Sequence, residues 1–423
     1  MGAEAGSAGL GRRAARIGSV AVRHLGGALV SRGGTVLDRL AGAAPAMLDE
    51  LGPFYIKVGQ LLSTRRDLLS DRLCDRLGTL TDTVPAPPRE AVAATLTEAY
   101  GPAERWPFRE FDWEPVGSGS IATVHRAELS DGRVAAVKVR RPGIVPLMRS
   151  DFRLAGAMAG TTRLVPGLRK LPAEEMLGQI GTAVLTQADL AAERASLERL
   201  RANLADASGV RLPEPYAEYS REQVLVMEYL DDLRDFTPEP YTAEERRDAM
   251  RRVLHTVYRM LFVDGLVHCD LHPGNLRLNA KGEVVILDAG FVVPLPDRVR
   301  RHFGGFFMNM AFGQGRRCAE IVIESAAKVP EGFDRAGFVA AVEELVGESA
   351  KVVAGEFNLA AFAPRLFKLQ RRYGIYAAAE FAFPLLSLLV IEGMIHSFDP
   401  GVDFQGEAVP ILMRTMGPSE HAS

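Results

Sequence analysis

Three side chains in the second half of the chain have types and spacing that suit phosphoryl transfer. Asp270 is followed five residues later by Asn275, and Asp288 comes eighteen residues after Asp270. Transfer of a phosphoryl group from a nucleotide needs one carboxylate to orient or deprotonate the acceptor. It also needs an amide and a second carboxylate to hold Mg²⁺ against the phosphates. A turn between a helix and a hairpin, with solvated acids, is the alternative, but the apolar run Val284–Leu287 favours the chemical interpretation.

The spacing of these residues matches the protein-kinase pattern H-R-D-x4-N…D-F-G. Cys269 stands in place of the arginine, and Ala289 stands in place of the phenylalanine. A kinase-like site also needs three upstream elements, which are a loop of small residues, a lysine on the following strand and a hinge strand.

The loop of small residues is residues 117–124, which we call the glycine loop. It begins Gly117-Ser118-Gly119-Ser120. Small residues let backbone N–H groups approach phosphates, so these four are the expected phosphate-binding residues. The loop alone is a weak signal that also suits a plain hairpin turn, and Ala122 departs from the pattern G-x-G-x-x-G.

Lys138 lies in the strand-like segment VAAVKV, close to the pattern V-A-I-K. The lysine of that pattern pairs with the α- and β-phosphates and with a glutamate on a helix. Glu193 is the expected partner and Glu198 is the alternative. The buried strand VLVMEYL is expected to read adenine through Met227, Glu228 and Leu230. The order of all these elements predicts a nucleotide site.

The bulk composition excludes several classes of protein. The 423 residues exceed one ordinary core and predict two or three structural units. A net charge of −3 gives no case for nucleic-acid binding. The three cysteines, Cys74, Cys269 and Cys318, form no CxxC motif, which suits the cytosol. A zinc site at His268, Cys269 and His272 is an alternative that lacks a nearby fourth ligand.

Pattern and composition divide the chain into five segments. These are a basic N-terminal segment (1–45), a helical extension (46–110), a β-rich N-lobe with a helical insertion (111–230), a helical C-lobe (231–405) and a tail (406–423). Residues 71–80 and 89–100 are expected to be helices, and residues 210–213 and 224–230 are expected to be a strand pair.

Two segments bear on membrane contact, the basic N-terminal segment and the most apolar run of the chain. The basic segment carries Arg12, Arg13, Arg16, Arg23, Arg32 and Arg39 around a rough apolar stripe. It is compatible with a helix on an anionic membrane and with a solvated helix packed on its own domain. The most apolar run, FAFPLLSLLVI, has eleven residues and predicts a buried core helix, since a membrane span needs about twenty.

The stretch FYIKVGQLLSTRRDLLSDRLCDRLGTLTDTVPAPP, Phe54 to Pro88, resembles the signature of the UbiB (AarF) family of atypical, protein-kinase-like enzymes. Lys57-Val58-Gly59-Gln60 matches its K-x-G-Q motif, and HCDLHPGN and SIATVHRA also resemble that family. The resemblance covers roughly residues 46–300. The K-x-G-Q segment separates the chain from aminoglycoside-type phosphotransferases, which share only the H-x-D-x-H-x-x-N loop.

This resemblance implies an α+β, bilobed protein-kinase-like fold with a small β-rich N-lobe and a helical C-lobe. The helical extension would pack over the active site as a lid that carries Lys57 and Gln60. The resemblance also implies Mg²⁺-dependent binding of ATP, or of ADP, and ATPase activity in lipid or isoprenoid-quinone metabolism. By position, Lys138 is the phosphate lysine, Glu193 its partner and Asp270 the catalytic acid, with Asn275 and Asp288 as metal ligands.

Two departures from the family pattern, and one from ordinary protein kinases, leave the reaction open. The family's loop is usually A-A-A-S, whereas this chain has Gly117-Ser118-Gly119-Ser120. The family's E-x-D on the lobe-bridging helix is here Gln187-Ala188-Asp189, so one carboxylate has become an amide. No A-P-E motif follows Gly290.

The leading hypothesis is therefore an ATP-binding kinase or ATPase that supports lipid, quinone or natural-product biosynthesis. It would be cytoplasmic, with peripheral contact to the inner face of the membrane as an option, and a lipid or quinone-like molecule or a biosynthetic enzyme would be its partner. The alternatives are a nucleotide-binding pseudokinase that acts as a scaffold, and a true small-molecule or protein kinase.

Overall fold

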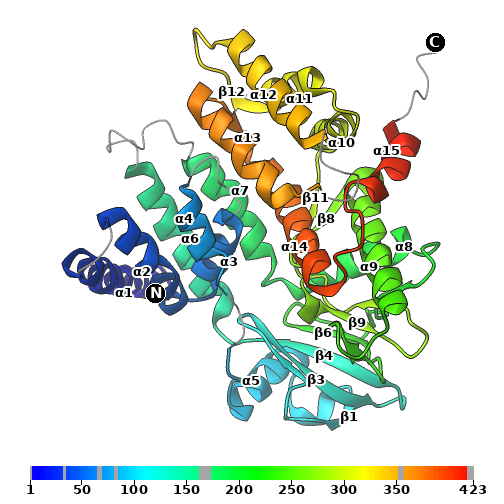
Figure 1. Ribbon diagram of the computed structural model, residues 1–423. Coiled ribbons are helices and arrows are strands. Elements are labelled where there is room, and N and C mark those ends of the chain that lie inside the picture. The colour runs from blue at the N-terminus through cyan, green and yellow to red at the C-terminus, as the bar shows by residue number, and fades with distance from the viewer. Residues whose placement is uncertain are drawn as a thin grey trace, which may run out of the picture. The chain divides into compact units, whose positions relative to one another are not determined.

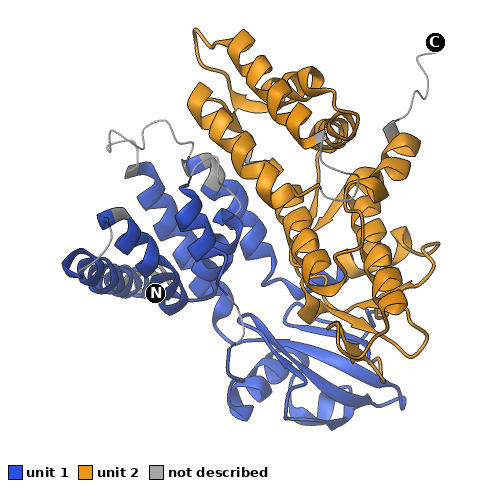
Figure 2. Cartoon of the chain, in the orientation of Figure 1, with its two compact units in different colours: residues 1–65, 69–195, 215–229 blue, residues 66–68, 196–214, 230–423 orange. Residues whose placement is uncertain are grey.

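The structure, a computed structural model, describes residues 2–31, 35–63, 69–80, 84–161, 173–350 and 357–416. The chain forms two compact units, which Figure 2 shows in different colours. Unit 1 comprises residues 1–65, 69–195 and 215–229, and unit 2 comprises residues 66–68, 196–214 and 230–423. Residues 196–214, which the sequence suggests for the N-lobe, therefore group with unit 2.

Unit 1 joins a helical part to an antiparallel sheet (Figure 1). Its helical elements are α1 (Gly2–Val30), α2 (Val36–Leu51), α3 (Pro53–Leu62), α4 (Asp71–Leu77), α5 (Arg89–Tyr100), η1 (Ala103–Arg105), α6 (Ile144–Thr161) and α7 (Ala173–Thr186). Its strands are β1 (Phe108–Phe111), β2 (Gly117–Ser118), β3 (Ala122–Leu129), β4 (Val134–Arg140) and β6 (Val224–Glu228). Helix α8 (Leu190–Asn203) begins in unit 1 and ends in unit 2.

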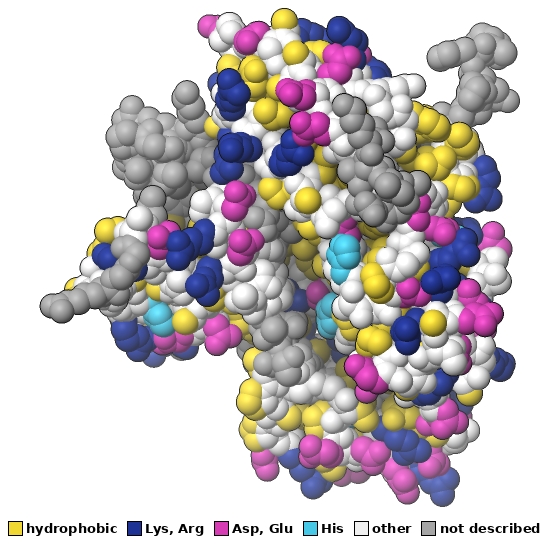
Figure 3. All heavy atoms as spheres, viewed as in Figure 1, with side chains coloured by type: hydrophobic (Ala, Val, Ile, Leu, Met, Phe, Trp, Pro, Cys, Tyr) yellow, Lys and Arg dark blue, Asp and Glu magenta, His cyan; other side chains and the backbone are white. Residues whose placement is uncertain are grey.

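The sheet of unit 1 has the order β1-β3-β4-β6, and β2 pairs with β3. The turn between β3 and β4 places Gly132 at φ +88°, which confirms the hairpin that Asp131-Gly132 predicts. Alternate residues of β4, among them Val137 and Val139, pack with Leu96 of α5 in one apolar core. Acidic and basic side chains are mixed over the β-rich part on the face that Figure 3 shows.

The helical part of unit 1 holds the basic N-terminal segment. The Arg13 guanidinium is buried and forms an ion pair with Asp151 of α6, with Nε 2.6 Å from Oδ1. Ile17 of α1 is also buried, whereas Val22 and Leu29 are exposed. One face of α1 therefore packs on its own unit, as one of the two interpretations of this segment expects. Arg32 lies outside the described residues.

Unit 2 contains the C-terminal helices and three small sheets (Figure 1). Its helical elements are α9 (Ala243–Tyr258), η3 (Arg259–Asp264), η4 (Pro273–Asn275), α10 (Asp297–Ala311), α11 (Gly315–Glu324), α12 (Arg335–Ala350), α13 (Leu359–Tyr373), η5 (Ala379–Phe381), α14 (Ala382–Phe398), η6 (Gly406–Ala408) and α15 (Val409–Met416). Its strands are β5 (Val210–Arg211), β7 (Arg234–Asp235), β8 (Leu266–His268), β9 (Leu276–Leu278), β10 (Val284–Ile286), β11 (Val292–Pro294), β12 (Ala326–Lys328) and β13 (Tyr376–Ala377).

The core of unit 2 is rich in aromatic side chains and contains the predicted apolar helix. Tyr258, Phe262 and Phe307 form ring contacts with one another. Helix α14 contains most of the apolar run and buries residues such as Leu388, which confirms the predicted core helix. Within the described ranges, no helix combines the length and the apolar character that crossing a membrane requires.

Several local predictions need correction. The expected strand pair does not form, because β5 pairs in parallel with β10 while β6 pairs with β4. Residues 406–416, expected to be part of a tail, form η6 and α15, and Leu412 is fully buried. The helix that begins at Asp71 ends at Leu77 rather than at residue 80, whereas α5 has the predicted ends.

Candidate functional site

Lys138 and Glu193 form the central ion pair of unit 1. Lys138 lies on β4, and its Nζ is 2.6 Å from Oε1 of Glu193 in the first turn of α8. The side chains are 13% and 3% exposed. Val137 and Val139 point into the apolar core, so strand alternation directs Lys138 to the opposite face of the sheet. The observed partner of Lys138 is therefore Glu193, which is the partner that the order of the motifs predicts.

Polar contacts around the start of α8 fix the position of Glu193. Oδ1 of Asp189 accepts hydrogen bonds from the backbone N–H groups of Ala191 and Ala192, at 3.0 and 3.1 Å, and so caps the helix. Arg140 of β4 donates from Nη1 to the carbonyl oxygen of Ala188 at 2.9 Å. The predicted lobe-bridging residue Asp189 thus has a structural role here.

Gln187 lies just before this cap and is 7% exposed. Its Nε2 has no hydrogen-bond partner among the residues that the structure describes. A buried amide donor without a partner costs about 1–3 kcal/mol. The substitution of an amide for the family's carboxylate therefore leaves an unsatisfied donor at this position.

The predicted hinge lies at the end of β6. Met227 is buried and pairs with Ala136 of β4, and Glu228 pairs with Ala135. The chain then leaves unit 1 after Tyr229 and enters unit 2 at Leu230. The three predicted hinge residues therefore span the junction of the two units.

The glycine loop is a tight β2–β3 hairpin in which Gly117 pairs with Val124 and Ser118 pairs with Thr123. The backbone N–H of Gly119 donates to the carbonyl oxygen of Ala122 at 3.0 Å. Neither glycine has a positive φ. A Cβ built on Gly117 or Gly119 would lie 3.9 or 3.6 Å from its nearest neighbour, which is ordinary contact. The fold itself therefore does not require glycine there, and the absence of side chains leaves the backbone approachable.

The K-x-G-Q motif lies on α3, and its residues have different surroundings. A Cβ on Gly59 would lie 2.6 Å from Leu80 Cδ1 and 2.8 Å from Leu48 Cδ1, so these two side chains would have to shift to admit a larger residue. Gln60 donates from Nε2 to the carbonyl oxygen of Leu80 at 3.1 Å. Lys57 is 3% exposed. The Gln60 amide therefore serves as a tie within unit 1, a role that the sequence does not indicate.

In unit 2, short strands position Asp270, Asn275 and Asp288. Asp270 follows β8, Asn275 immediately precedes β9, and Asp288 follows β10. Strands β9 and β10 are antiparallel, and the N–H of Leu287 donates to the Asn275 carbonyl oxygen at 3.0 Å. The Asn275 side chain donates from Nδ2 to the carbonyl oxygen of Asp270 at 2.8 Å. These bonds bring Asp270, Asn275 and Asp288 together at the ends of these short strands, and we call this group of three residues the rim.

His268 connects the two acidic segments of this rim. Its Nε2 is 2.7 Å from the carbonyl oxygen of Asp288, and the N–H of Asp270 donates to its Nδ1 at 3.3 Å. This pattern requires a neutral ring with the proton on Nε2. Burial lowers the pKa of His268, which favours the same neutral form. The histidine of the motif is therefore an organiser of the site.

The rim fits Mg²⁺ better than zinc. Asn275 donates from Nδ2, which leaves its Oδ1 as the ligand atom, and Asp288 supplies carboxylate oxygens, of which Oδ1 accepts from the Gly290 N–H at 2.8 Å. Mg²⁺ commonly takes one or two protein oxygens together with phosphates and water. Among the described residues, no group of three or more His, Cys, Asp and Glu side chains has a geometry for a metal ion.

The thiol of Cys269 is held inside unit 2. Cys269 is buried, its Sγ donates to the carbonyl oxygen of Val267 at 3.8 Å, and burial raises its pKa far above the ordinary value. Cys74 and Cys318 are buried as well. Burial raises the pKa of Cys318 to about 12.

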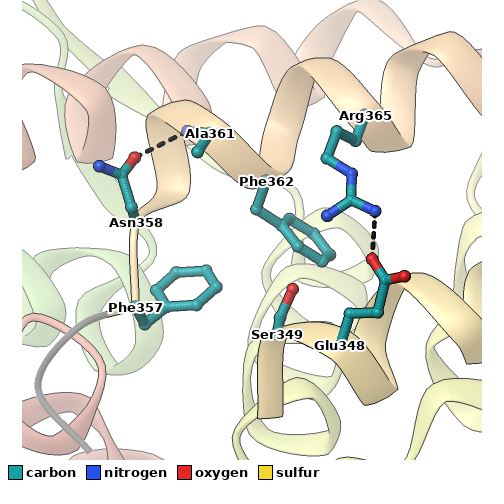
Figure 4. Close-up of a pocket in the computed structure, with 7 residues that line it drawn as sticks. All are labelled: Glu348, Ser349, Phe357, Asn358, Ala361, Phe362 and Arg365. Atoms are coloured by element: carbon teal, nitrogen blue, oxygen red, sulfur yellow. Dashed lines mark hydrogen bonds and ion pairs between the residues drawn. The ribbon is translucent and has the colours of Figure 1, made fainter. Parts of the chain in front are cut away.

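A separate pocket of about 160 Å³ lies in unit 2, between the end of α12 and the start of α13 (Figure 4). The rings of Phe357 and Phe362, 5.8 Å apart, form part of its wall, and Glu348 and Arg365 form an ion pair at its edge. Its polar side chains are half-buried or exposed. The pocket contains none of the predicted site residues, which are Gly117, Ser118, Gly119, Ser120, Lys138, Gln187, Asp189, Glu193, Met227, Glu228, Leu230, Asp270, Asn275, Asp288, Lys57 and Gln60.

Comparison with known proteins agrees with these motifs. The model of the ABC1 atypical kinase-like domain matches residues 79–322. The probable protein kinase UbiB of Pseudomonas putida is 31% identical over 382 residues, which cover 87% of this chain and 69% of that protein. The uncharacterized protein slr0889 of Synechocystis sp. is 32% identical over 295 residues, or 67% of this chain and 72% of that protein.

Among solved structures, the complex of Rv3197 with erythromycin from Mycobacterium tuberculosis has a TM-score of 0.49 and 22% sequence identity. The match covers 84% of this chain and 94% of that chain. The family model spans more than half of the 423 residues, from the helical extension to α11. The sheet of unit 1, the helices of unit 2 and the match to the ABC1 model establish an α+β kinase-like fold. Together with the similarity to UbiB proteins, that match shows that the chain belongs to the ABC1 (UbiB) family of atypical kinase-like proteins.

Proposed function

We propose that this ABC1-family protein binds Mg·ATP and either hydrolyses it or transfers its terminal phosphoryl group. The buried ion pair between Lys138 and Glu193 carries the proposal. In protein kinases this pair must be in place for a lysine to hold the α- and β-phosphates. A lysine with only a structural role would gain little stability from a buried carboxylate partner, because the cost of removing both charges from water offsets their attraction.

The remaining residues fit defined roles in this reaction. The glycine loop would offer backbone N–H groups to phosphates, and the Met227–Leu230 hinge would contact adenine. Asp270 would orient the acceptor hydroxyl or water and accept its proton. Asn275 and Asp288 would hold Mg²⁺, which neutralises phosphate charge when bound. ADP would make most of the same contacts.

A nucleotide-binding pseudokinase that acts as a scaffold is the second candidate. The buried Gln187, whose amide donor has no partner among the described residues, supports it. In this case the protein binds nucleotide without turnover and presents its surface to a biosynthetic enzyme.

The resemblance to UbiB proteins supports a setting in isoprenoid-quinone, lipid or natural-product biosynthesis, with a lipid or quinone-like small molecule as a further ligand. The exposed Val22 and Leu29 on α1, together with the exposed Arg12 and Arg16, support peripheral contact with an anionic membrane. Exposed apolar and cationic side chains on one helix suit such a surface.

The deciding experiment measures the melting temperature with Mg·ATP, and the release of phosphate with and without anionic phospholipid vesicles. We expect a rise in melting temperature and turnover that Asp288→Asn removes. Asp297→Asn, an exposed aspartate of α10, is the matched control. Absence of both a thermal shift and turnover would contradict the proposal. Binding with no more turnover than in Asp270→Ala would favour the pseudokinase.

A further inference from the structure

Arg141 connects the glycine loop to a second segment of unit 1. This segment is residues 84–88, Val-Pro-Ala-Pro-Pro, which we call the strap. Arg141 donates from Nη2 to the carbonyl oxygen of Pro85 at 2.8 Å, and from Nε to the carbonyl oxygen of Gly119 at 2.8 Å. It therefore holds the loop and the strap with one side chain.

Ser118 reinforces this connection. Its Oγ donates to the carbonyl oxygen of Val84 at 2.9 Å and accepts from Nη2 of Arg141 at 3.0 Å. The backbone N–H of Arg141 also donates to the carbonyl oxygen of Ile121 at 2.8 Å. Both arms of the hairpin are thus bonded to Arg141, and one arm is bonded directly to the strap.

The chemistry of this contact requires arginine. The three side-chain acceptors of Arg141 are two carbonyls and a hydroxyl. A planar guanidinium directs several N–H groups at once, whereas a lysine ammonium is a point charge on a flexible stem. The guanidinium of Arg141 is partly buried, and this burial lowers its pKa.

The strap is well suited as the fixed side of the contact. Three of its five residues are proline, which restricts φ and favours an extended backbone without internal hydrogen bonds. The carbonyl oxygens of Val84 and Pro85 therefore remain available as acceptors for Ser118 and Arg141. Pro88 leads directly into α5, which packs in the core of the sheet.

In this conformation the two serine hydroxyl groups of the loop are occupied or buried. Ser118 is committed to Val84 and Arg141. Ser120 is 3% exposed, and its Oγ has no hydrogen-bond partner among the described residues. A loop that cradles phosphates turns such groups towards the ligand. An unsatisfied hydroxyl costs about 1–3 kcal/mol. This cost destabilises the present conformation of the loop, so the loop should leave it more readily when the Arg141 bonds are lost.

We infer that Arg141 is a positioning residue that clamps the glycine loop against the strap in a resting conformation, from which the loop must move before Ser120 can meet nucleotide phosphates. The inference rests on the proposed function for its nucleotide part. Its mechanical part, the clamp, stands on the hydrogen bonds within unit 1 alone. Because only the unclamped fraction binds, the clamp lowers the apparent affinity for nucleotide.

The mechanical part is tested by hydrogen–deuterium exchange of the full chain without nucleotide. In Arg141→Ala we expect peptides that cover residues 117–124 to exchange roughly fivefold faster or more, and in Ser118→Ala we expect a smaller increase. Arg109→Ala, an exposed arginine on β1 of the same sheet, should leave that exchange unchanged. Peptides of β4 and β6 should be protected equally in all variants. If residues 117–124 exchange at the same rate in Arg141→Ala as in the wild type, the clamp is overturned.

The nucleotide part is tested by titration with Mg·ATP. We expect Arg141→Ala to lower the Kd roughly fivefold, because it removes all the side-chain bonds of the clamp. Arg141→Lys should lower the Kd less, because an ammonium group keeps some of these bonds. An unchanged or higher Kd in Arg141→Ala would overturn the resting-state assignment. If wild-type protein binds no nucleotide while the exchange result holds, the proposed function fails and the clamp is supported.

Discussion

The side-chain amide of Gln60 donates to the backbone carbonyl of Leu80, and this bond ties α3 to the segment that follows α4. The neighbouring Gly59 packs against the Leu80 side chain at the same place. Two of the four K-x-G-Q residues therefore hold unit 1 together, and Lys57 of the same motif is buried as well.

Substitutions in this motif should separate stability from chemistry. Gln60→Ala removes one hydrogen bond and should lower the free energy of unfolding by about 1 kcal/mol. Gly59→Ala forces the Leu48 and Leu80 side chains to shift, and should cost about 1–3 kcal/mol. Lys57→Met removes the cation that the proposed function places in the lid motif, and it should lower ATP turnover more than either of the other two variants does. Equal losses of turnover in all three variants would contradict this division.

The Lys138–Glu193 pair should show strong coupling. Glu193→Gln or Lys138→Met leaves one buried partner without its counter-charge, and each should cost about 3–5 kcal/mol. The double variant should be destabilised by less than the sum, because no isolated charge remains. Thermal and urea unfolding of the four proteins measures the coupling. Additive losses would show that the two side chains contribute independently.

The two rim aspartates should have distinct kinetic effects. Asp270→Asn should lower kcat by roughly 100-fold or more while Mg·ATP still raises the melting temperature, because it removes a proton acceptor. Asp288→Asn should also weaken the Mg²⁺-dependent part of nucleotide binding, since it removes a ligand charge. Titration of Mg²⁺ at fixed ATP distinguishes them. Indistinguishable Mg²⁺ dependence in the two variants would argue against separate roles.

Glu392 of α14 should make stability depend on pH. Its carboxylate is buried and accepts from the backbone N–H groups of Leu359 and Ala360 at the start of α13. Burial raises the pKa of Glu392 above its ordinary value of 4.5, so the folded protein holds this proton more tightly than the unfolded chain. The contribution of Glu392 is therefore most favourable below about pH 4.5 and declines as the pH rises through the raised pKa.

The corresponding measurement compares the free energy of unfolding of the wild type with that of Glu392→Gln from about pH 4 to about pH 7. The advantage of the wild type should shrink with rising pH. Glu331→Gln, at an exposed position, is the control. Its free energy of unfolding should differ from that of the wild type by an amount that does not change with pH. A difference between wild type and Glu392→Gln that is constant with pH would contradict the assignment.

The sequence was sufficient for features that depend on local signals or on the order of motifs. Helix α5 begins and ends as predicted, because Pro87-Pro88 and Gly101-Pro102 mark its limits. Glu193 was found as the partner of Lys138 because the order of kinase elements narrows the choice to one helix. Asp270, Asn275 and Asp288 lie on one rim because short strands connect them.

Features that depend on pairing between distant segments could not be predicted. The two-residue strand β5 pairs with β10, which lies far along the chain, and no local pattern specifies that partner. Arg13 looks like any basic residue of the N-terminal segment until Asp151 of α6 lies beside it. Arg141 follows a strand without any motif, and its acceptors are backbone carbonyls, which every residue has.

The burial of all three cysteines makes the native chain suitable for site-specific labelling. Cys74, Cys269 and Cys318 are each at most 2% exposed, so none should compete for a thiol reagent under native conditions. A cysteine introduced at an exposed position of each unit would carry a dye without removal of native residues. Energy transfer between two such dyes would then report whether the distance between them changes when nucleotide is added.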